Sequence, residues 1–177
     1  MTDSSFYPAP PAKARLVMPA TAPALKLTAP ALEVMTDLTT EAAHVVAPER
    51  QIDDALRDMV VFGVRLLLVM REPNVIGMVT SYDILGERPI QFLQDPFRSG
   101  KPHRHADITV ADIMTPIEAI QPLRVGWVAG ATAAEIAALF RSRADTHLLV
   151  ADDDADGGVV IRGIFSRSRL ARQLTGA

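Results

Sequence analysis

Hydrophobic positions change their spacing in a set order in the first half of the chain. Between Ile52 and Val60 they recur at helical spacing, and Gly63 follows where a helix would end. Two apolar runs come next, at 66–70 and 75–80, and the turn-like residues between them predict a β-hairpin. The pattern therefore predicts a helix followed by two antiparallel strands.

The second predicted strand is expected to run directly into another helix at Thr80. Thr80 is followed three residues later by Asp83, which is the spacing of a capping box at a helix start. Such a junction exposes unpaired backbone N–H groups at the positive end of a helix dipole, and these attract anions. A plain cap would place the same two residue types at the same spacing without any ligand. The residues alone therefore leave a structural cap and a ligand site both open.

Segments of the first half are echoed in the second half. The pairs are 34–37 with 113–116, 66–69 with 147–150, and 77–83 with 163–169. The separation of the paired segments grows from 79 to 86 residues, which places small insertions in loops. An internal duplication explains the three echoes together.

The second half also carries its own start and stop signals. Thr132 and Glu135 form a second capping box ahead of an apolar helical face. Strands are predicted from His147 and from 159, and Ser166 is expected to begin a last helix that ends near Gly176.

The order helix, strand, strand, helix, closed by the residues G-M-V-T-x-x-D at 77–83, resembles the CBS domain, a regulatory module first recognised in cystathionine β-synthase. The resemblance covers Val34 to about Leu93. It implies an α+β fold with two tandem CBS modules, each a small sheet covered by two helices, related by a pseudo-two-fold duplication. The predicted division is a Pro/Ala-rich arm at 1–33, a first module at 34–94, a linker at 95–107 and a second module at 108–177.

The resemblance also implies an adenosyl ligand in a cleft between the two modules. In the family, the position of Asp83 accepts hydrogen bonds from the ribose hydroxyls, and that of Thr80 contacts ribose or phosphate. Met78 and Arg65 are further ligand-binding candidates. Arg65 precedes a core strand, where it could reach a phosphate or simply extend from an apolar run into water.

The second copy departs from this pattern at the expected ribose-binding position. Arg169 stands where the acid should be, and a guanidinium cannot accept a hydrogen bond from a ribose hydroxyl. Ser166, Arg167 and Arg169 are therefore candidates for a separate anion site. Two solvated arginines on a terminal helix are the alternative.

Composition and motifs exclude several other classes of function. A formal net charge of −3 gives no support to general nucleic-acid binding, and without cysteine there are no disulfides or thiolate sites. The apolar runs are too short to span a bilayer and the start lacks a secretory pattern, so a cytoplasmic protein is expected. The run Asp152 to Gly157 begins like a calcium-binding loop, but the twelfth position, which should be a glutamate, is Gly163. His103 and His105 could bind zinc only with further ligands, and none is nearby in the sequence. No metal site and no enzyme motif is expected.

These observations lead to two hypotheses. The first is a regulatory protein, not an enzyme, that needs no cofactor, senses AMP, ADP, ATP or S-adenosylmethionine between its modules, and signals to a protein partner in trans. The second is a ligand-free dimerisation or scaffold protein with the same fold. A homodimer is expected in either case, because Val60, Val61 and Phe62 are consecutive and a helix cannot bury all three in one core. The alternative is a monomer whose arm covers that surface with the apolar residues Leu16, Val17, Leu25 and Leu27.

Overall fold

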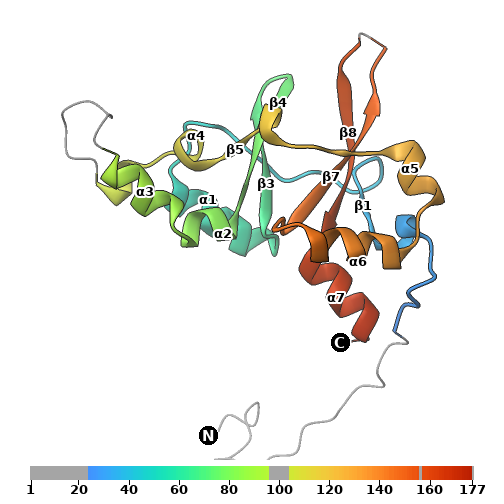
Figure 1. Ribbon diagram of the computed structural model, residues 1–177. Helices are drawn as coiled ribbons and strands as arrows, with labels where there is room; N and C mark the ends of the chain where they lie inside the picture. The colour runs from blue at the N-terminus through green and yellow to red at the C-terminus, as the bar shows by residue number, and fades with distance from the viewer. Residues whose placement is uncertain (1–23, 96–103, 156, 177) are drawn as a thin grey trace, which may run out of the picture.

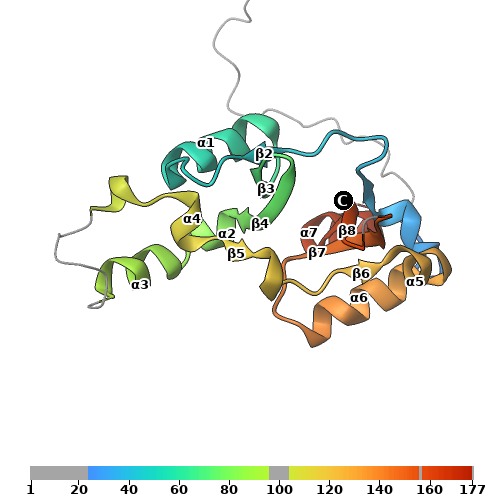
Figure 2. The same ribbon diagram turned by 90° about the horizontal axis from the view of Figure 1, so that it is seen from above.

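The computed structural model describes residues 24–95, 104–155 and 157–176. These residues form two four-stranded sheets with helices packed on them. Figure 1 shows the two central hairpins side by side, each with helices at its lower end, and Figure 2 shows the same pair from above. The predicted α+β fold with two similar halves is confirmed.

The first half has the predicted order of elements. Helix α1 (Ile52–Phe62) ends at Gly63, whose φ of 67° lies in the left-handed region that glycine tolerates best. Strands β3 (Leu66–Arg71) and β4 (Asn74–Thr80) form the antiparallel hairpin, and α2 (Ser81–Leu85) follows directly. Thr80 is the N-cap of α2, so the predicted strand-to-helix junction is confirmed.

The helix that starts at Thr80 does not continue past Pro89. α2 ends at Leu85, and a separate helix α3 (Arg88–Gln94) begins with Pro89 in its first turn. Between them the chain is extended at Gly86, where a Cβ would lie 2.5 Å from the Tyr82 carbonyl oxygen. The extended backbone at Gly86 ends α2, and α3 leaves in a new direction (Figure 1).

The second half repeats the arrangement. Helix α6 (Ala133–Ser142) is capped by Thr132 with Glu135, the hairpin consists of β7 (His147–Asp153) and β8 (Val159–Ser166), and α7 (Arg167–Thr175) ends at Gly176. The capping box, the hairpin and the last helix were all predicted. Among the elements that were not predicted are η2 (His105–Asp107), α4 (Val110–Ile113) and α5 (Val125–Gly130).

The two halves exchange their first strands. Strand β1 (Thr36–Asp37) pairs with β8 of the second sheet, and β5 (Thr115–Pro116) pairs with β4 of the first. The sheets are completed by β2 (Val45–Val46) beside β3 and by β6 (Leu123–Arg124) beside β7, both parallel. Gly77 permits the close pairing, because a Cβ there would lie 2.5 Å from the Thr115 carbonyl oxygen. Each sheet is therefore completed by a strand from the other half of the sequence.

Three apolar clusters hold the molecule together. One lies under α1 and α2 and includes Met59 and Leu67, and a second lies under α6 and α7 and includes Phe140 and Phe165. The third joins the two sheets through Leu66, Leu68 and Leu149. Because this third cluster draws on both hairpins, the relative position of the two halves is fixed by apolar packing as well as by strand exchange.

The described part of the N-terminal arm lies on the second half. Leu25 packs against the second cluster and its N–H donates to the Gln173 carbonyl, while the Leu27 carbonyl accepts from Ala134. The short helix η1 (Ala31–Val34) follows and precedes β1, as α4 precedes β5 in the second half, and η3 (Ile117–Ala119) follows β5. Leu25 and Leu27 therefore do not cover α1, and Leu16 and Val17 lie outside the described residues.

The end of α1 carries an apolar surface, as predicted. Val60, Val61 and Phe62 are 75%, 79% and 49% exposed, and Tyr82 and Leu85 on neighbouring α2 are exposed as well. Within the described ranges, no helix combines the length and apolar character needed to cross a membrane.

Candidate functional site

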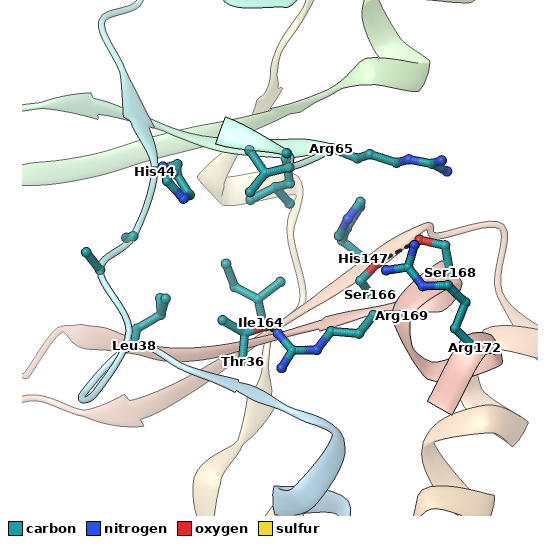
Figure 3. A pocket seen from close by; sticks show the side chains of 15 residues that line it. Thr36, Leu38, His44, Arg65, His147, Ile164, Ser166, Ser168, Arg169 and Arg172 are labelled. Carbon is teal, nitrogen blue, oxygen red and sulfur yellow. Dashed lines mark hydrogen bonds between the residues drawn. The ribbon is translucent and has the colours of Figure 1, made fainter. Parts of the chain in front are cut away.

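A cleft between the halves has a volume of about 360 Å³ (Figure 3). We call it the open cleft. Its lining comes from both halves of the chain: Thr36, Leu38, Ala42, Ala43, His44, Gly63, Val64, Arg65, Leu66, His147, Ile164, Ser166, Ser168, Arg169 and Arg172. Pockets for small ligands commonly have volumes of about 300–1,000 Å³, so the open cleft is large enough for one.

Local structure places these side chains at the cleft. The chain leaves the left-handed turn at Gly63 and enters β3, which brings Val64 and Arg65 to one side. The junction of β8 with α7 brings Ser166 and Arg169 to the opposite side, and the exchanged strand β1 brings Thr36 next to Arg169 (Figure 3). The site therefore exists only when both halves are folded together.

Positive charge dominates the lining of the open cleft. Arg65, Arg169 and Arg172 contribute guanidinium groups, and none of the lining residues is an aspartate or a glutamate. This contrasts with the formal net charge of −3 of the whole chain. The Arg169 Nη1 donates to Thr36 Oγ1 at 2.7 Å, and Arg65 Nη1 donates to the Tyr82 hydroxyl at 3.3 Å.

His147 lies at the back of the open cleft and is neutral at physiological pH. The residue is 6% exposed, and Nδ1 is 3.1 Å from Thr146 Oγ1. Burial is the main reason that its pKa falls from 6.5 to about 4; the Asp83 carboxylate opposes this shift and Arg65 adds to it. The histidine therefore adds no positive charge to the cleft near neutral pH.

The start of α7 differs from the start of α2. The Ser166 hydroxyl makes no capping hydrogen bond to the backbone of α7 and instead forms a 3.2 Å hydrogen bond with the Ser168 hydroxyl. The first turn of α7 also contains no acidic residue. Backbone N–H groups at this helix end are thus left without the side-chain acceptor that a capping box supplies.

Asp83, by contrast, is fully engaged inside the protein. Its Oδ2 accepts from the Thr80 N–H at 2.8 Å and from Thr80 Oγ1 at 2.7 Å, and the Asp83 N–H donates to Thr80 Oγ1 at 3.3 Å. Its Oδ1 lies 3.1 Å from Arg88 Nε. The capping-box interpretation of these two residues is confirmed, and an ion pair uses the remaining carboxylate oxygen.

The second cleft lies on the Arg88 side and is small. It has a volume of about 150 Å³ and is lined by Met78, Arg88 and Thr115, with His147 between it and the open cleft. The Arg88 guanidinium donates to the Ile113 carbonyl at 2.6 Å and to Thr115 Oγ1 at 3.0 Å. We call it the narrow cleft, because Arg88 crosses the space in front of Asp83.

The site residues predicted from the sequence do not all lie at one cleft. Arg65, Ser166 and Arg169 come together at the open cleft, and Met78 lies at the narrow cleft. Arg167 does not reach the open cleft: its Nη2 donates to the carbonyls of Phe140 and Arg143 on the other side of α7. That Thr80, Asp83 and Met78 bind a ligand stays a prediction.

Sequence reasoning missed several residues at these sites. Arg172 follows Arg169 by three positions in a predicted helix, so helical spacing could have placed both on one face. Arg88 and Thr36 carry no comparable signal, because their contacts with Asp83 and Arg169 depend on α3 and on strand exchange.

No set of three or more His, Cys, Asp or Glu side chains gathers as a metal site within 24–95, 104–155 and 157–176. His103 and Asp156, from the zinc and calcium patterns weighed above, lie outside these ranges.

Comparisons with known proteins agree with this architecture. A family model for the CBS domain matches residues 33–89. The structure of CBSX2 in complex with AMP has a TM-score of 0.55 and 27% sequence identity, with 81% of this chain and 94% of that chain covered. A structure of the CBS-pair protein CBSX2 from Arabidopsis thaliana gives 0.52 and 25%, with 81% and 92% covered.

An uncharacterized conserved protein from Pyrococcus horikoshii is also similar, with a TM-score of 0.56, 25% identity, and 84% of this chain and 93% of that chain covered. Comparison with curated protein sequences gives no match. Residues 33–89 thus match the CBS domain, and the chain as a whole is similar in structure to CBS-pair proteins.

Proposed function

We propose that this protein is a regulatory module that binds an adenosyl ligand in the open cleft and passes occupancy to a partner protein in trans. The observation that carries the proposal is the open cleft itself, about 360 Å³ in volume and lined by both modules. A ligand there contacts the β3 side and the α7 side together, so its binding free energy is linked to the relative position of the modules. That linkage is what a regulatory module requires.

The chemistry of the cleft fits an adenosyl compound. Leu38, Val64 and Ile164 supply an apolar wall against which a base can pack, and Ser166, Ser168, Arg169 and Arg172 add hydroxyl and guanidinium groups from the end of β8 and from α7. The similar protein CBSX2 has been solved in complex with AMP. This likeness supports an adenine nucleotide as the first ligand to test.

One ligand per chain follows from the difference between the two clefts. The narrow cleft has less than half the volume of the open one, and Arg88 pairs with the carboxylate that would otherwise receive a ribose. The same observation favours the second candidate function, a ligand-free scaffold, if the open cleft also stays empty in solution.

The exposed end of α1 supports a homodimer as part of this function. Val60, Val61 and Leu85 are each more than two-thirds exposed, on the neighbouring helices α1 and α2. Exposed apolar residues that gather in this way commonly mark an interface. We infer that α1 and α2 of one chain pack against the same helices of a second copy about a two-fold axis.

The ligand proposal predicts that filling the open cleft abolishes binding. Ala43 is exposed and lines the cleft, so Ala43→Trp places an indole in the ligand space with little effect on the core. At a ligand concentration one hundred times its Kd, wild type gains about 2.7 kcal/mol, or roughly 5–10 °C in Tm. Thermal unfolding in the presence of AMP, ATP or S-adenosylmethionine, each tested separately, should show this shift for wild type with at least one of the three compounds, and with none of them for Ala43→Trp.

Ala47→Trp is the matched control, because Ala47 is an exposed alanine of the same segment that does not line the cleft. Its shift should equal that of wild type. If none of the three compounds stabilises wild type, the ligand-free scaffold becomes the better function. An equal shift in Ala43→Trp and wild type would place the ligand elsewhere.

A further inference from the structure

Resting on the proposed function, we propose that the open cleft selects ligands by their phosphate charge, with Arg65, Arg169 and Arg172 as specificity-determining residues. The ligand class is a nucleotide that carries a chain of phosphates. A neutral nucleoside, or an adenosyl compound bearing a sulfonium cation, is disfavoured. The proposal concerns which adenosyl compound binds, and its basis is the charge of the cleft.

The three arginines reach the cleft from two directions. Arg65 comes from the start of β3, and Arg169 and Arg172 come from one face of α7 (Figure 3). Arg172 forms no ion pair with any residue in the described parts of the chain. Its positive charge is therefore available to a ligand, and no lining carboxylate opposes it.

Arg169 retains hydrogen-bonding capacity after its structural contacts are counted. Its Nη1 donates to Thr36 Oγ1. Its Nη2 lies 3.9 Å from the exposed Glu41 carboxylate, and this long ion pair is screened by solvent. A guanidinium has five N–H donors, so Arg169 can hold β1 and still donate to a phosphate oxygen. At the position where an acid would accept hydrogen bonds from a ribose, Arg169 can therefore donate hydrogen bonds to an anion.

The open start of α7 adds donors to the same place. Ser166 and Ser168 line the cleft, and neither a side-chain cap nor an acid occupies the first turn of this nine-residue helix. An anion beside Arg169 would serve as the missing cap. The opposite holds at α2, where Thr80 and Asp83 already supply the acceptor oxygens.

Calorimetry on the full chain with adenosine, AMP, ADP, ATP, S-adenosylmethionine and inorganic tripolyphosphate tests this inference. Affinity should rise in the order adenosine, AMP, ADP, ATP, with ATP at least about tenfold tighter than adenosine. S-adenosylmethionine should bind no better than adenosine. Raising NaCl from about 50 mM to about 500 mM should weaken ATP binding and leave adenosine binding nearly unchanged.

Variants assign the selectivity to its residues. Arg172→Ala and Arg169→Ala should each weaken ATP about tenfold or more while changing adenosine binding by less than about threefold. Arg169→Lys should keep part of the ATP affinity. Arg167→Ala is the matched control, since Arg167 lies on α7 but faces Phe140 and Arg143, and it should leave ATP binding unchanged.

The outcomes separate this inference from the proposed function. Equal binding of adenosine and ATP, unaffected by salt and by Arg172→Ala, overturns the charge selectivity and leaves an adenosyl site in place. Binding of tripolyphosphate without any adenosyl compound overturns the proposed function and supports the anion site. Binding of none of the six compounds overturns both.

Discussion

Val61→Asp is expected to convert the protein from a homodimer to a monomer without unfolding it. Val61 is 79% exposed at the end of α1, so the aspartate meets no neighbour within a folded chain. In the proposed dimer the substitution occurs twice about the symmetry axis and buries two unpaired carboxylates in an apolar interface. We expect the dimer Kd to rise at least about a hundredfold. Light scattering at micromolar concentration should then give a mass near 19.1 kDa, half that of wild type.

Val61 is a cleaner test position than Phe62. The Phe62 ring stacks on His44 with ring centroids 4.7 Å apart, and His44 lines the open cleft, so changing Phe62 would also disturb the ligand site. Val159→Asp is the matched control and should keep the wild-type mass, because Val159 is an apolar residue, 56% exposed, at the start of β8 in the other sheet. A wild-type mass of one chain would contradict the dimer.

Acidification is expected to destabilise the protein through His147. The folded-state pKa of about 4 lies below the ordinary value of 6.5, so between these pH values the unfolded chain binds a proton that the folded chain does not. The stability that His147 contributes is full above about pH 6.5 and is lost as the pH falls toward 4. Between pH 7.5 and 4.5 the loss from this one group is about 2 kcal/mol.

Denaturant unfolding of wild type and His147→Gln at both pH values measures this contribution. Glutamine keeps a polar group beside Thr146 and cannot titrate in this range. The variant should lose about 2 kcal/mol less stability than wild type on acidification. An equal loss in the two proteins would mean that the histidine, which faces both Asp83 and Arg65, already binds its proton in the folded state.

Local signals in the sequence predicted the elements that depend on neighbouring residues. The αL end of α1 at Gly63, the capping boxes at Thr80 and Thr132, and the two hairpins all follow from spacings of a few residues. The break between α2 and α3 was missed, because it depends on the extended backbone that the chain adopts at Gly86.

The exchange of strands could not be predicted from these patterns. Thr36 and Thr115 open the two sequence repeats, and hydrophobic alternation does not specify which sheet a two-residue strand joins. The pairing depends on contacts distant in sequence, such as the close approach of Gly77 to the Thr115 carbonyl.

The candidate site shows the same division between local and distant effects. The duplicated motif correctly directed attention to Asp83 and to its replacement by Arg169. It gave no sign that Arg88 pairs with Asp83 and crosses the narrow cleft. The larger cavity consequently lies beside the motif that departs from the family pattern.

A calorimetric titration of wild type and Asp83→Ala with ATP tests most directly whether the open cleft holds the ligand. Asp83 binds Thr80 and Arg88 and does not line the open cleft, so its loss should cost about 1 kcal/mol of folding stability and little affinity. The expected result is one ATP per chain in both proteins, with affinities that agree within about threefold. Two equivalent sites in wild type, or a ten- to hundredfold loss in Asp83→Ala, would contradict it, because a ribose bound by Asp83 predicts a loss of about that size.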